Sequence, residues 1–305
     1  MDGSDRARAV TRASLQRFQL AEGPVWHAGR QRLLWVDIVS GLVFEGRLTD
    51  GVVTETARHE FAGMVGAVAP AADGRLLVAA QEHLIVLHPD GTRDDGPRVV
   101  PVGAQRRLND AAVDPAGRLL VGTLSLAGES SGEVLVRLED DGRLTTVDDD
   151  LSLSNGLAWS ADGRLLYSVD TLRRTVFVRD YSSVGPAGES GARPARRVHL
   201  ELTDGFPDGI ALDAQGHLWV AVWGAGEVRR YSPEGRLGDR VRVPAPHTSS
   251  LAFAGADLRT LVITTARVEL TADQLRDHPD SGSLFTTRVD VPGLPTTLWS
   301  GLGAR

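Results

Sequence analysis

The 305-residue chain contains no cysteine. Disulfide bonds and thiolate chemistry are therefore excluded, and any bound metal must be held by oxygen atoms or by imidazole. A chain without cysteine suits a reducing compartment, so we expect a cytoplasmic protein.

Long apolar runs and dense basic clusters are also missing. No stretch approaches the roughly 18 apolar residues of a membrane-spanning helix, and the basic segment up to Phe18 lacks the apolar core of a signal peptide. The net charge is −7, without the clustered basic residues that binding to nucleic acid requires. We therefore expect a soluble protein that binds neither membranes nor nucleic acid.

Amphipathic helices are a third absence, because no convincing helical periodicity is found. The apolar segments are five or six residues long, rich in Leu and Val, and bounded by Asp-Gly, Ala-Gly or Gln-Gly turns. Further short strands such as H-L-I-V-L and E-V-L-V-R-L lie between them and end at similar turns. This pattern predicts an all-β protein made of hairpins.

An internal repeat organises these strands. Four segments place a polar or permissive residue ten positions before a Leu that begins an apolar strand. These residues, which we term slots, are Gly66, Asn109, Asn155 and Asp208. A fifth copy has its slot at Glu22, one residue further from Leu33, and a degenerate sixth copy runs from about Ser250 to Leu261.

The repeat length predicts the architecture. The leucines that begin the repeated strand are Leu33, Leu76, Leu119, Leu165, Leu218 and Leu261, spaced by 43, 43, 46, 53 and 43 residues. Each spacing accommodates four strands and three turns. Six such units predict a six-bladed β-propeller with four-stranded antiparallel blades, formed by residues 1–305 as a single domain.

The ends of the chain and one insertion complete this prediction. The run A-R-A-V-T-R-A near the N-terminus is compatible with a strand and could close the ring as the outer strand of the last blade. We expect residues 1–7 to form a flexible tail. The Gly/Pro/Ser-rich residues 182–197 predict an extended surface loop.

Four of the slots carry side chains that can hold a metal. The first strand of each propeller blade lines the central channel, so Glu22, Asn109, Asn155 and Asp208 should face one another near one mouth. Their carboxylates and amides are hard oxygen donors, which suit Ca²⁺, Mg²⁺ or Mn²⁺ and can also hold Zn²⁺. Taken singly, the Asn-Gly and Pro-Asp-Gly sequences are typical of turns. Their shared register in different blades instead favours a site.

Several motifs now identify a resemblance to a known family. They are A-E-G-P-V-W followed by L-L-W-V-D-I, R-L-N-D-A-A-V-D-P-A-G-R followed by V-G-T, S-N-G-L-A-W-S, and P-D-G-I-A-L-D-A-Q-G-H-L-W-V-A. In order and spacing, from about residue 18 to 295, the chain resembles the six-bladed propellers of the senescence marker protein, gluconolactonase and luciferin-regenerating enzyme family.

The resemblance implies roles for particular residues. It implies one divalent cation held by Glu22, Asn155 and Asp208, and a substrate contacted by Arg107 and Asn109. It also implies hydrolysis of small sugar lactones, with Asp208 as the general base. The alternative is that Arg107 is a surface residue and Asn109 a turn residue.

One segment departs from the family pattern. Many members that act on aldonolactones carry an acidic segment after V-G-T, whereas this chain has L-S-L-A-G-E-S from Leu124 to Ser130. The carboxylate on the substrate side is therefore missing or displaced to Glu129. Two further residues are candidates for the channel mouth: Trp223 as a pocket wall, and His247 just before the sixth repeat.

The residue types also fit the implied chemistry. A divalent cation polarises a lactone carbonyl and lowers the pKa of a bound water, while a carboxylate such as Asp208 can accept the proton. We therefore favour metal-dependent hydrolysis of a small aldonolactone. The alternatives are a hydrolase of another ester or of an organophosphate, and a non-catalytic regulatory propeller with a structural metal. The oligomeric state stays open.

Overall fold

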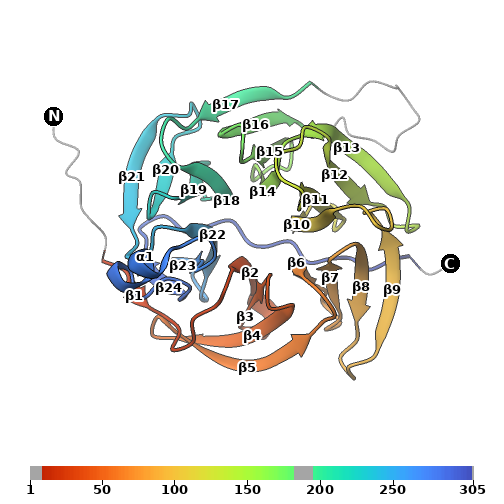
Figure 1. The fold of residues 1–305 in the computed structure, drawn as a ribbon, viewed down its shortest axis with the longest axis horizontal. Helices are drawn as coiled ribbons and strands as arrows, with labels where there is room; N and C mark the ends of the chain where they lie inside the picture. Colours follow the sequence, from red (N-terminus) through yellow and green to blue (C-terminus); the bar gives the residue numbers. More distant parts are fainter. Residues whose placement is uncertain (1–8, 182–194, 304–305) are drawn as a thin grey trace.

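The computed structural model describes residues 9–181 and 195–303. These residues form six four-stranded antiparallel sheets arranged as blades around a central axis, which confirms the predicted six-bladed propeller (Figure 1). The predicted tail at residues 1–7 and most of the predicted loop at residues 182–197 lie outside the described residues. The last residue of that loop, Arg197, begins an outer strand instead.

Each blade runs from an inner strand at the channel to an outer strand at the rim (Figure 1). Blade 1 contains β2 (Ala21–His27), β3 (Arg32–Asp37), β4 (Leu42–Thr49) and β5 (Val52–Glu60). Blade 2 contains β6 (Val65–Pro70), β7 (Leu76–Ala80), β8 (His83–Leu87) and β9 (Arg93–Arg98). Blade 3 contains β10 (Arg106–Val113), β11 (Leu119–Ser125), β12 (Glu133–Leu138) and β13 (Leu144–Leu151). Blade 4 contains β14 (Ser154–Trp159), β15 (Leu165–Asp170), β16 (Thr175–Asp180) and β17 (Arg197–Glu201). Blade 5 contains β18 (Phe206–Leu212), β19 (Leu218–Trp223), β20 (Glu227–Tyr231) and β21 (Leu237–Arg242).

Blade 6 is built from both ends of the chain, and this confirms the predicted closure of the ring. It contains β22 (Thr248–Ala254), β23 (Thr260–Thr265), β24 (Phe285–Arg288) and, as its outer strand, β1 (Thr11–Arg12). Thr11 is the register partner of Thr286, and the N–H of Ala13 donates to the carbonyl of Leu284 at 2.7 Å. Pairing the two ends in one sheet leaves the ring without a free joint.

The core lies between neighbouring blades. Every residue of β7 and of β23 is buried, because the second strand of a blade packs against another blade on each face. In blade 1, Trp35 stacks on Phe44 with ring centroids 5.2 Å apart and meets Phe18 edge-on at 5.8 Å. The short apolar runs of the sequence are thus the buried middle layers of the blades.

Two short helical segments were missed by the sequence analysis. They are the 3₁₀ turn η1 (Ala28–Arg30) and the helix α1 (Ala272–Asp277). Thr271 and Gln274 form a capping box that satisfies the first backbone N–H groups of α1. Six residues with no buried side chain show no helical periodicity. Within the described parts of the chain, no helix has the length and apolar character needed to cross a bilayer.

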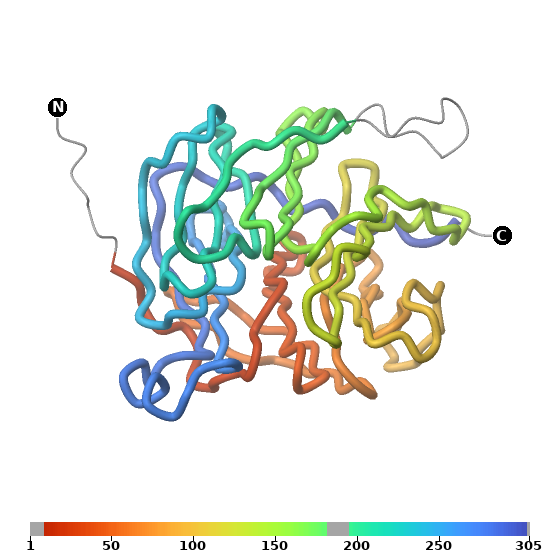
Figure 2. The backbone as a smooth tube through the Cα atoms, turned by 45° about the horizontal axis from the view of Figure 1, so that its top comes forward, coloured from red at the N-terminus to blue at the C-terminus, as the bar shows by residue number. Residues whose placement is uncertain are grey.

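A C-terminal segment, residues 290–303, crosses one mouth of the channel after β24 (Figures 1 and 2). Its N–H groups donate to carbonyls of blades 6, 5, 2 and 3, from Gly293 to Leu258, Leu294 to Leu212, Trp299 to Pro70 and Ser300 to Gly117, at 2.9–3.0 Å. We term this segment the C-terminal strap. It ties together blades on opposite sides of the ring, and no feature of the sequence had indicated it.

Candidate metal and substrate site

All six inner strands carry an irregularity at or beside the slot. The register with the second strand shifts between Glu22 and Val25, Val65 and Ala67, Leu108 and Ala111, Asn155 and Leu157, Pro207 and Ile210, and Thr248 and Ser250. An extra residue in a strand bends it and re-aims the side chains nearby. The repeat therefore turns the slot residues toward the channel by the same local device in every blade.

Glycines at or directly after the slots bring neighbouring inner strands close together. A Cβ atom on Gly156 would lie 2.5 Å from the carbonyl oxygen of Asp208, and one on Gly209 would lie 2.0 Å from Oγ of Ser250. On Gly66 it would lie 2.3 Å from the carbonyl oxygen of Asn109. Only glycine fits such a close backbone approach. The slots of adjacent blades are consequently near neighbours.

The five residues singled out by the sequence line one cavity of about 330 Å³ at the mouth where the inner strands begin. Glu22, Arg107, Asn109, Asn155 and Asp208 are each only 5–6% exposed and form what we term the polar floor. They come from blades 1, 3, 4 and 5. The structure thus places together residues that are far apart in the sequence, as the shared register had predicted.

The other two slots contribute no donor to this floor. Gly66 has no side chain. In blade 6 the register shift includes Ser249, whose hydroxyl donates to the carbonyl of Ala21 at 2.6 Å and is therefore used in joining two blades. Ser250, where the sequence placed the start of the degenerate copy, lines a different cavity at the opposite mouth.

Hydrogen bonds fix the amides of the floor. Nη1 of Arg107 donates to Oδ1 of Asn109 at 2.7 Å, and Nδ2 of Asn109 donates to the carbonyl of Ser154 at 2.8 Å. Nδ2 of Asn155 donates to Oγ1 of Thr171 at 3.1 Å. The hydroxyl of Thr171 in turn donates to the Pro207 carbonyl at 2.9 Å. These bonds hold the donor atoms of the floor in set directions.

Two oxygen atoms of the floor are buried without a hydrogen-bond partner in the described structure: Oδ1 of Asn155 and Oδ1 of Asp208. Leaving such an acceptor buried and unsatisfied costs about 1–3 kcal/mol, and more for a charged group. These two unpaired acceptor oxygens, from blades 4 and 5, lie in the same cavity as Glu22. A bound cation would provide the partner that they lack.

The charges of the floor point the same way. Burial, reinforced by the neighbouring carboxylate of Asp110, raises the pKa of Glu22 to about 8, although the Gly23 N–H, Arg107 and a hydrogen bond with Asp208 oppose this. Burial, together with repulsion by Glu22 and Asp110, holds the pKa of Asp208 well above its usual range. Burial also lowers the pKa of Arg107 to about 10, although Glu22 and Asp208 oppose this. This cluster contains several buried acids but a single guanidinium, so a bound cation would balance its charge.

Asp110 is a member of this cluster that the sequence analysis missed. Burial raises its pKa to about 6, and its side chain accepts the N–H of Ala111 at 2.8 Å. A signal was present in the sequence. Asp110 follows a slot at the position where glycine follows Glu22, Asn155 and Asp208.

The residues of the floor therefore fit a divalent cation. Carboxylate and amide oxygens are the ligands of hard cations. The described residues contain no cluster of three or more His, Cys, Asp and Glu side chains suited to a metal, so such a site depends on the amide oxygen of Asn155. Mixed donors of this kind do not select sharply among Ca²⁺, Mg²⁺, Mn²⁺ and Zn²⁺.

Above the floor the same cavity has apolar walls. Seven partly exposed side chains form what we term the apolar collar: Leu20, Leu124, Leu153, Leu172, Phe206, Trp223 and Val268. Trp223 lines the cavity, as suggested by the sequence. His247 is not part of the lining but stacks on Trp223, with ring centroids 4.1 Å apart, and its Nδ1 lies 3.0 Å from the carbonyl of Val268.

The missing carboxylate on the substrate side is not replaced by Glu129. The side chain of Glu129 is exposed and does not line the cavity, whereas Leu124 from the same segment does. Glu269 is the acidic residue of the lining outside the floor, and it is exposed at the rim.

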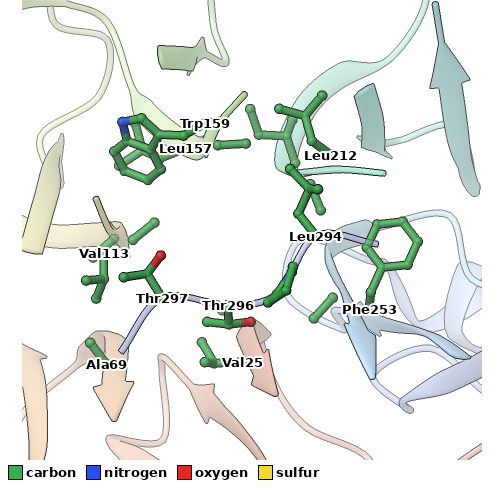
Figure 3. A pocket seen from close by; sticks show the side chains of 18 of the residues that line it. Val25, Ala69, Val113, Leu157, Trp159, Leu212, Phe253, Leu294, Thr296 and Thr297 are labelled. Carbon is green, nitrogen blue, oxygen red and sulfur yellow. The ribbon is translucent and has the colours of Figure 1, made fainter. Parts of the chain in front are cut away.

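The opposite mouth holds a second cavity of about 470 Å³ (Figure 3). It is lined by later residues of the inner strands, among them Val25, Ala69 and Leu212, and by Leu294 and Thr296 of the C-terminal strap. Figure 3 shows these largely apolar side chains arranged in a ring around the cavity. Asp110 also lines this second cavity and not that of the polar floor, while most of the other side chains at this end are apolar.

The fold and this donor set define a six-bladed β-propeller with a candidate metal site at one mouth of its channel. The family described as SMP-30/Gluconolactonase/LRE-like region matches residues 20–267, and the chain belongs to this family. Family membership agrees with the resemblance found in the sequence motifs.

Three relatives illustrate the similarity. A 6-deoxy-6-sulfogluconolactonase of Pseudomonas putida is 35% identical over 283 residues, covering 92% of this chain and 95% of the relative. A pentonolactonase of Haloferax volcanii is 36% identical over 297 residues, covering 94% and 96%. The crystal structure of a calcium-binding protein, regucalcin, from Agrobacterium tumefaciens is 27% identical, with a TM-score of 0.86, and covers 96% of this chain and 97% of that one.

Proposed function

We propose that this protein hydrolyses a small sugar lactone, an aldonolactone, to the corresponding acid with the help of one divalent cation. The observation that carries the proposal is the polar floor, where two buried oxygen atoms from different blades lack a partner beside Glu22. The lactonases among the relatives support the reaction class. The calcium-binding relative supports Ca²⁺ as one of the candidate cations.

In this proposal Glu22, Asn155 and Asp208 hold the cation. A divalent cation in this position supplies polarisation of the lactone carbonyl and a lower pKa for an attacking water. It would also offset the burial and carboxylate repulsion that raise the pKa values of Glu22 and Asp208, so that both carboxylates are ionised near neutral pH.

Proton transfer falls to Asp208. Its carboxylate accepts a proton from the attacking water as the water oxygen bonds to the carbonyl carbon. When the bond from this carbon to the ring oxygen breaks, Asp208 returns the proton to the departing alkoxide. The products are one carboxyl group and one hydroxyl group, so water is consumed and no other reactant is needed.

Arg107 and Asn109 position the substrate. Nη1 of Arg107 donates to Oδ1 of Asn109 and to the carbonyl of Leu108, and these bonds orient the remaining donors of the guanidinium. Those donors can hold hydroxyl or carbonyl oxygens of a lactone in the cavity. Asn109 is in turn fixed by the carbonyl of Ser154 and so keeps the guanidinium in place.

The experiment is an acid-release screen on purified protein, preceded by metal analysis. Pentono- and hexono-1,4-lactones are offered after chelator treatment and after re-addition of Ca²⁺, Mg²⁺, Mn²⁺ or Zn²⁺. We expect hydrolysis to stop with chelator and to return with at least one cation. Hydrolysis that continues at full rate in the metal-depleted protein would overturn the proposed role of the cation.

A further inference from the structure

We propose that the substrate is a lactone whose end remote from the ester carbonyl is apolar, such as a deoxy sugar lactone that ends in a methyl group. This inference rests on the proposed lactone hydrolysis and names the substrate class within it. The observation behind it is that the seven apolar side chains of the collar line the same cavity as the polar floor and are all more exposed than the floor residues.

The collar offers few partners to hydroxyl groups. Apart from the floor, the polar groups that line the cavity within the described residues are the hydroxyl of Thr171, the indole N–H of Trp223 and the carboxylate of Glu269 at the rim. The hydroxyl of Thr171 already accepts from Asn155 and donates to Pro207. A substrate hydroxyl held against the collar would therefore lose its hydrogen bonds to water without replacement, which costs about 1–3 kcal/mol.

The two aromatic side chains of the collar are held in place from outside the cavity. Phe206 and Trp223 are register partners in β18 and β19. The guanidinium of Arg174 lies over the ring of Phe206, 4.4 Å from its centroid, and His247 stacks on Trp223. A preorganised apolar wall binds an apolar group at little cost in side-chain entropy.

Leu172 shows that the collar has apolar surface left to bury. This side chain is 41% exposed in a structure whose other large apolar residues are mostly buried. Covering such surface with a methyl group stabilises the complex, whereas a hydroxymethyl group in the same place does not gain as much.

The charges of the cavity argue against an anionic end. Among the described lining residues only Arg107 is cationic, and it lies in the floor. Glu269 at the rim would repel a sulfonate, phosphate or carboxylate that extended past the collar. The cavity thus favours a remote end that is both uncharged and apolar.

The test compares a matched pair of lactones that differ by one oxygen atom, L-rhamnono-1,4-lactone and L-mannono-1,4-lactone. The metal-loaded full-length protein should hydrolyse the methyl-terminated rhamnonolactone with a kcat/KM at least about tenfold higher, a ratio within the range that an apolar pocket achieves against an added hydroxyl. Leu172→Asn should reduce this ratio several-fold by adding a hydrogen-bonding group to the wall.

Leu126→Asn is the matched control. Leu126 is 40% exposed, close to the value for Leu172, but does not line the cavity, so its replacement should leave the ratio unchanged. Equal kcat/KM values for the two lactones, or a preference for mannonolactone, would overturn the inference while leaving the proposed reaction intact.

Calorimetry separates failure of the inference from failure of the reaction. The metal-loaded protein is titrated with L-rhamnonate and with L-mannonate, the acids of the same pair. Tighter binding of rhamnonate supports the collar's selectivity even if no lactone is hydrolysed. The absence of hydrolysis would then contradict the proposed function and leave the inference about the collar standing. Equal binding of both acids, like equal kcat/KM values, speaks against the collar.

Discussion

The two ends of the channel are built from the same inner strands but differ in character. At the end where these strands begin, the slots of four blades carry an acid or an amide and, with Arg107, form the polar floor. At the other end the strands supply mostly apolar side chains, and the C-terminal strap runs across the mouth (Figure 3). One end holds the carboxylates Glu22 and Asp208, whereas the other, which Asp110 also lines, contributes mainly packing and backbone hydrogen bonds.

This difference shows how a repeated fold separates chemistry from stability. The bulge beside each slot interrupts regular pairing, so a slot side chain is free to serve a site rather than the sheet. The strap compensates at the other end by linking blades 2, 3, 5 and 6. Substitutions at the two ends should consequently change different quantities.

The largest effect is expected from Asp208→Asn at the polar floor. The amide cannot accept the water's proton and adds no negative charge for the cation. We expect kcat/KM to fall at least about a thousandfold, or about 4 kcal/mol, in steady-state acid release. Asp162→Asn provides the control, because Asp162 is an exposed acid of the opposite cavity, and its activity should stay within about twofold of wild type. A loss of less than tenfold for Asp208→Asn would contradict the assigned role.

At the other mouth, Trp299→Ala should affect stability. Trp299 is 3% exposed, packs in the cluster between blades 2 and 3, and lies under the guanidinium of Arg75 at 5.3 Å. Its removal leaves a cavity, and we expect urea denaturation to show a loss of about 3 kcal/mol. The ratio of kcat/KM values for L-rhamnono-1,4-lactone and L-mannono-1,4-lactone should stay unchanged at 25 °C. If that ratio shifted while stability did not, the separation of the two ends would be wrong.

Gly156→Ala tests how the inner strands approach one another. The new Cβ would lie 2.5 Å from the carbonyl oxygen of Asp208, so the slot of blade 5 must shift. We expect a loss of about 2 kcal/mol in unfolding free energy, together with weaker metal binding in calorimetry. Gly238→Ala has nothing nearer than 3.5 Å to its new Cβ and should be nearly neutral. Equal effects of both substitutions would speak against this packing role.

Much of this site could be predicted from the sequence because equivalent positions of a repeat occupy equivalent places in each blade. Asn155 and Asp208 occupy equivalent positions in successive repeats, so closing the ring brings them together whatever the details of packing. Glu22 was also found, although its repeat is one residue longer. Closure by the N-terminal strand followed from the need to pair the last blade.

What the sequence could not provide lies outside the repeat. The strap, residues 290–303, has no periodic pattern, and its course is set by backbone hydrogen bonds to four blades. Helix α1 is too short to show an apolar stripe. The apolar collar draws on strand ends and loops of several blades, including Leu20, Leu172 and Val268, and only their arrangement in space shows that they share a wall.

The smallest expected effect is the pH dependence of stability that the buried carboxyl group of Glu22 produces at the polar floor. In metal-free protein the pKa of Glu22 is about 8, above its ordinary value of 4.5. Between these two pH values the folded state keeps a proton that the unfolded state releases, so the stabilising contribution of this proton is complete below pH 4.5 and is lost as pH rises through about 8.

Chelator-treated wild type should therefore lose about 1 kcal/mol of unfolding free energy per pH unit in this window relative to Glu22→Gln, which carries no titrating group at this position. Taking the difference between the two proteins removes the opposite contribution of histidines such as His199 and His247, whose pKa values are lowered by burial. Urea titrations at pH 6 and pH 7 measure the difference. Because a cation would take the place of the proton, saturating metal should remove the pH dependence of this difference. Parallel pH profiles for the two metal-free proteins would mean that Glu22 is not part of a buried acidic cluster.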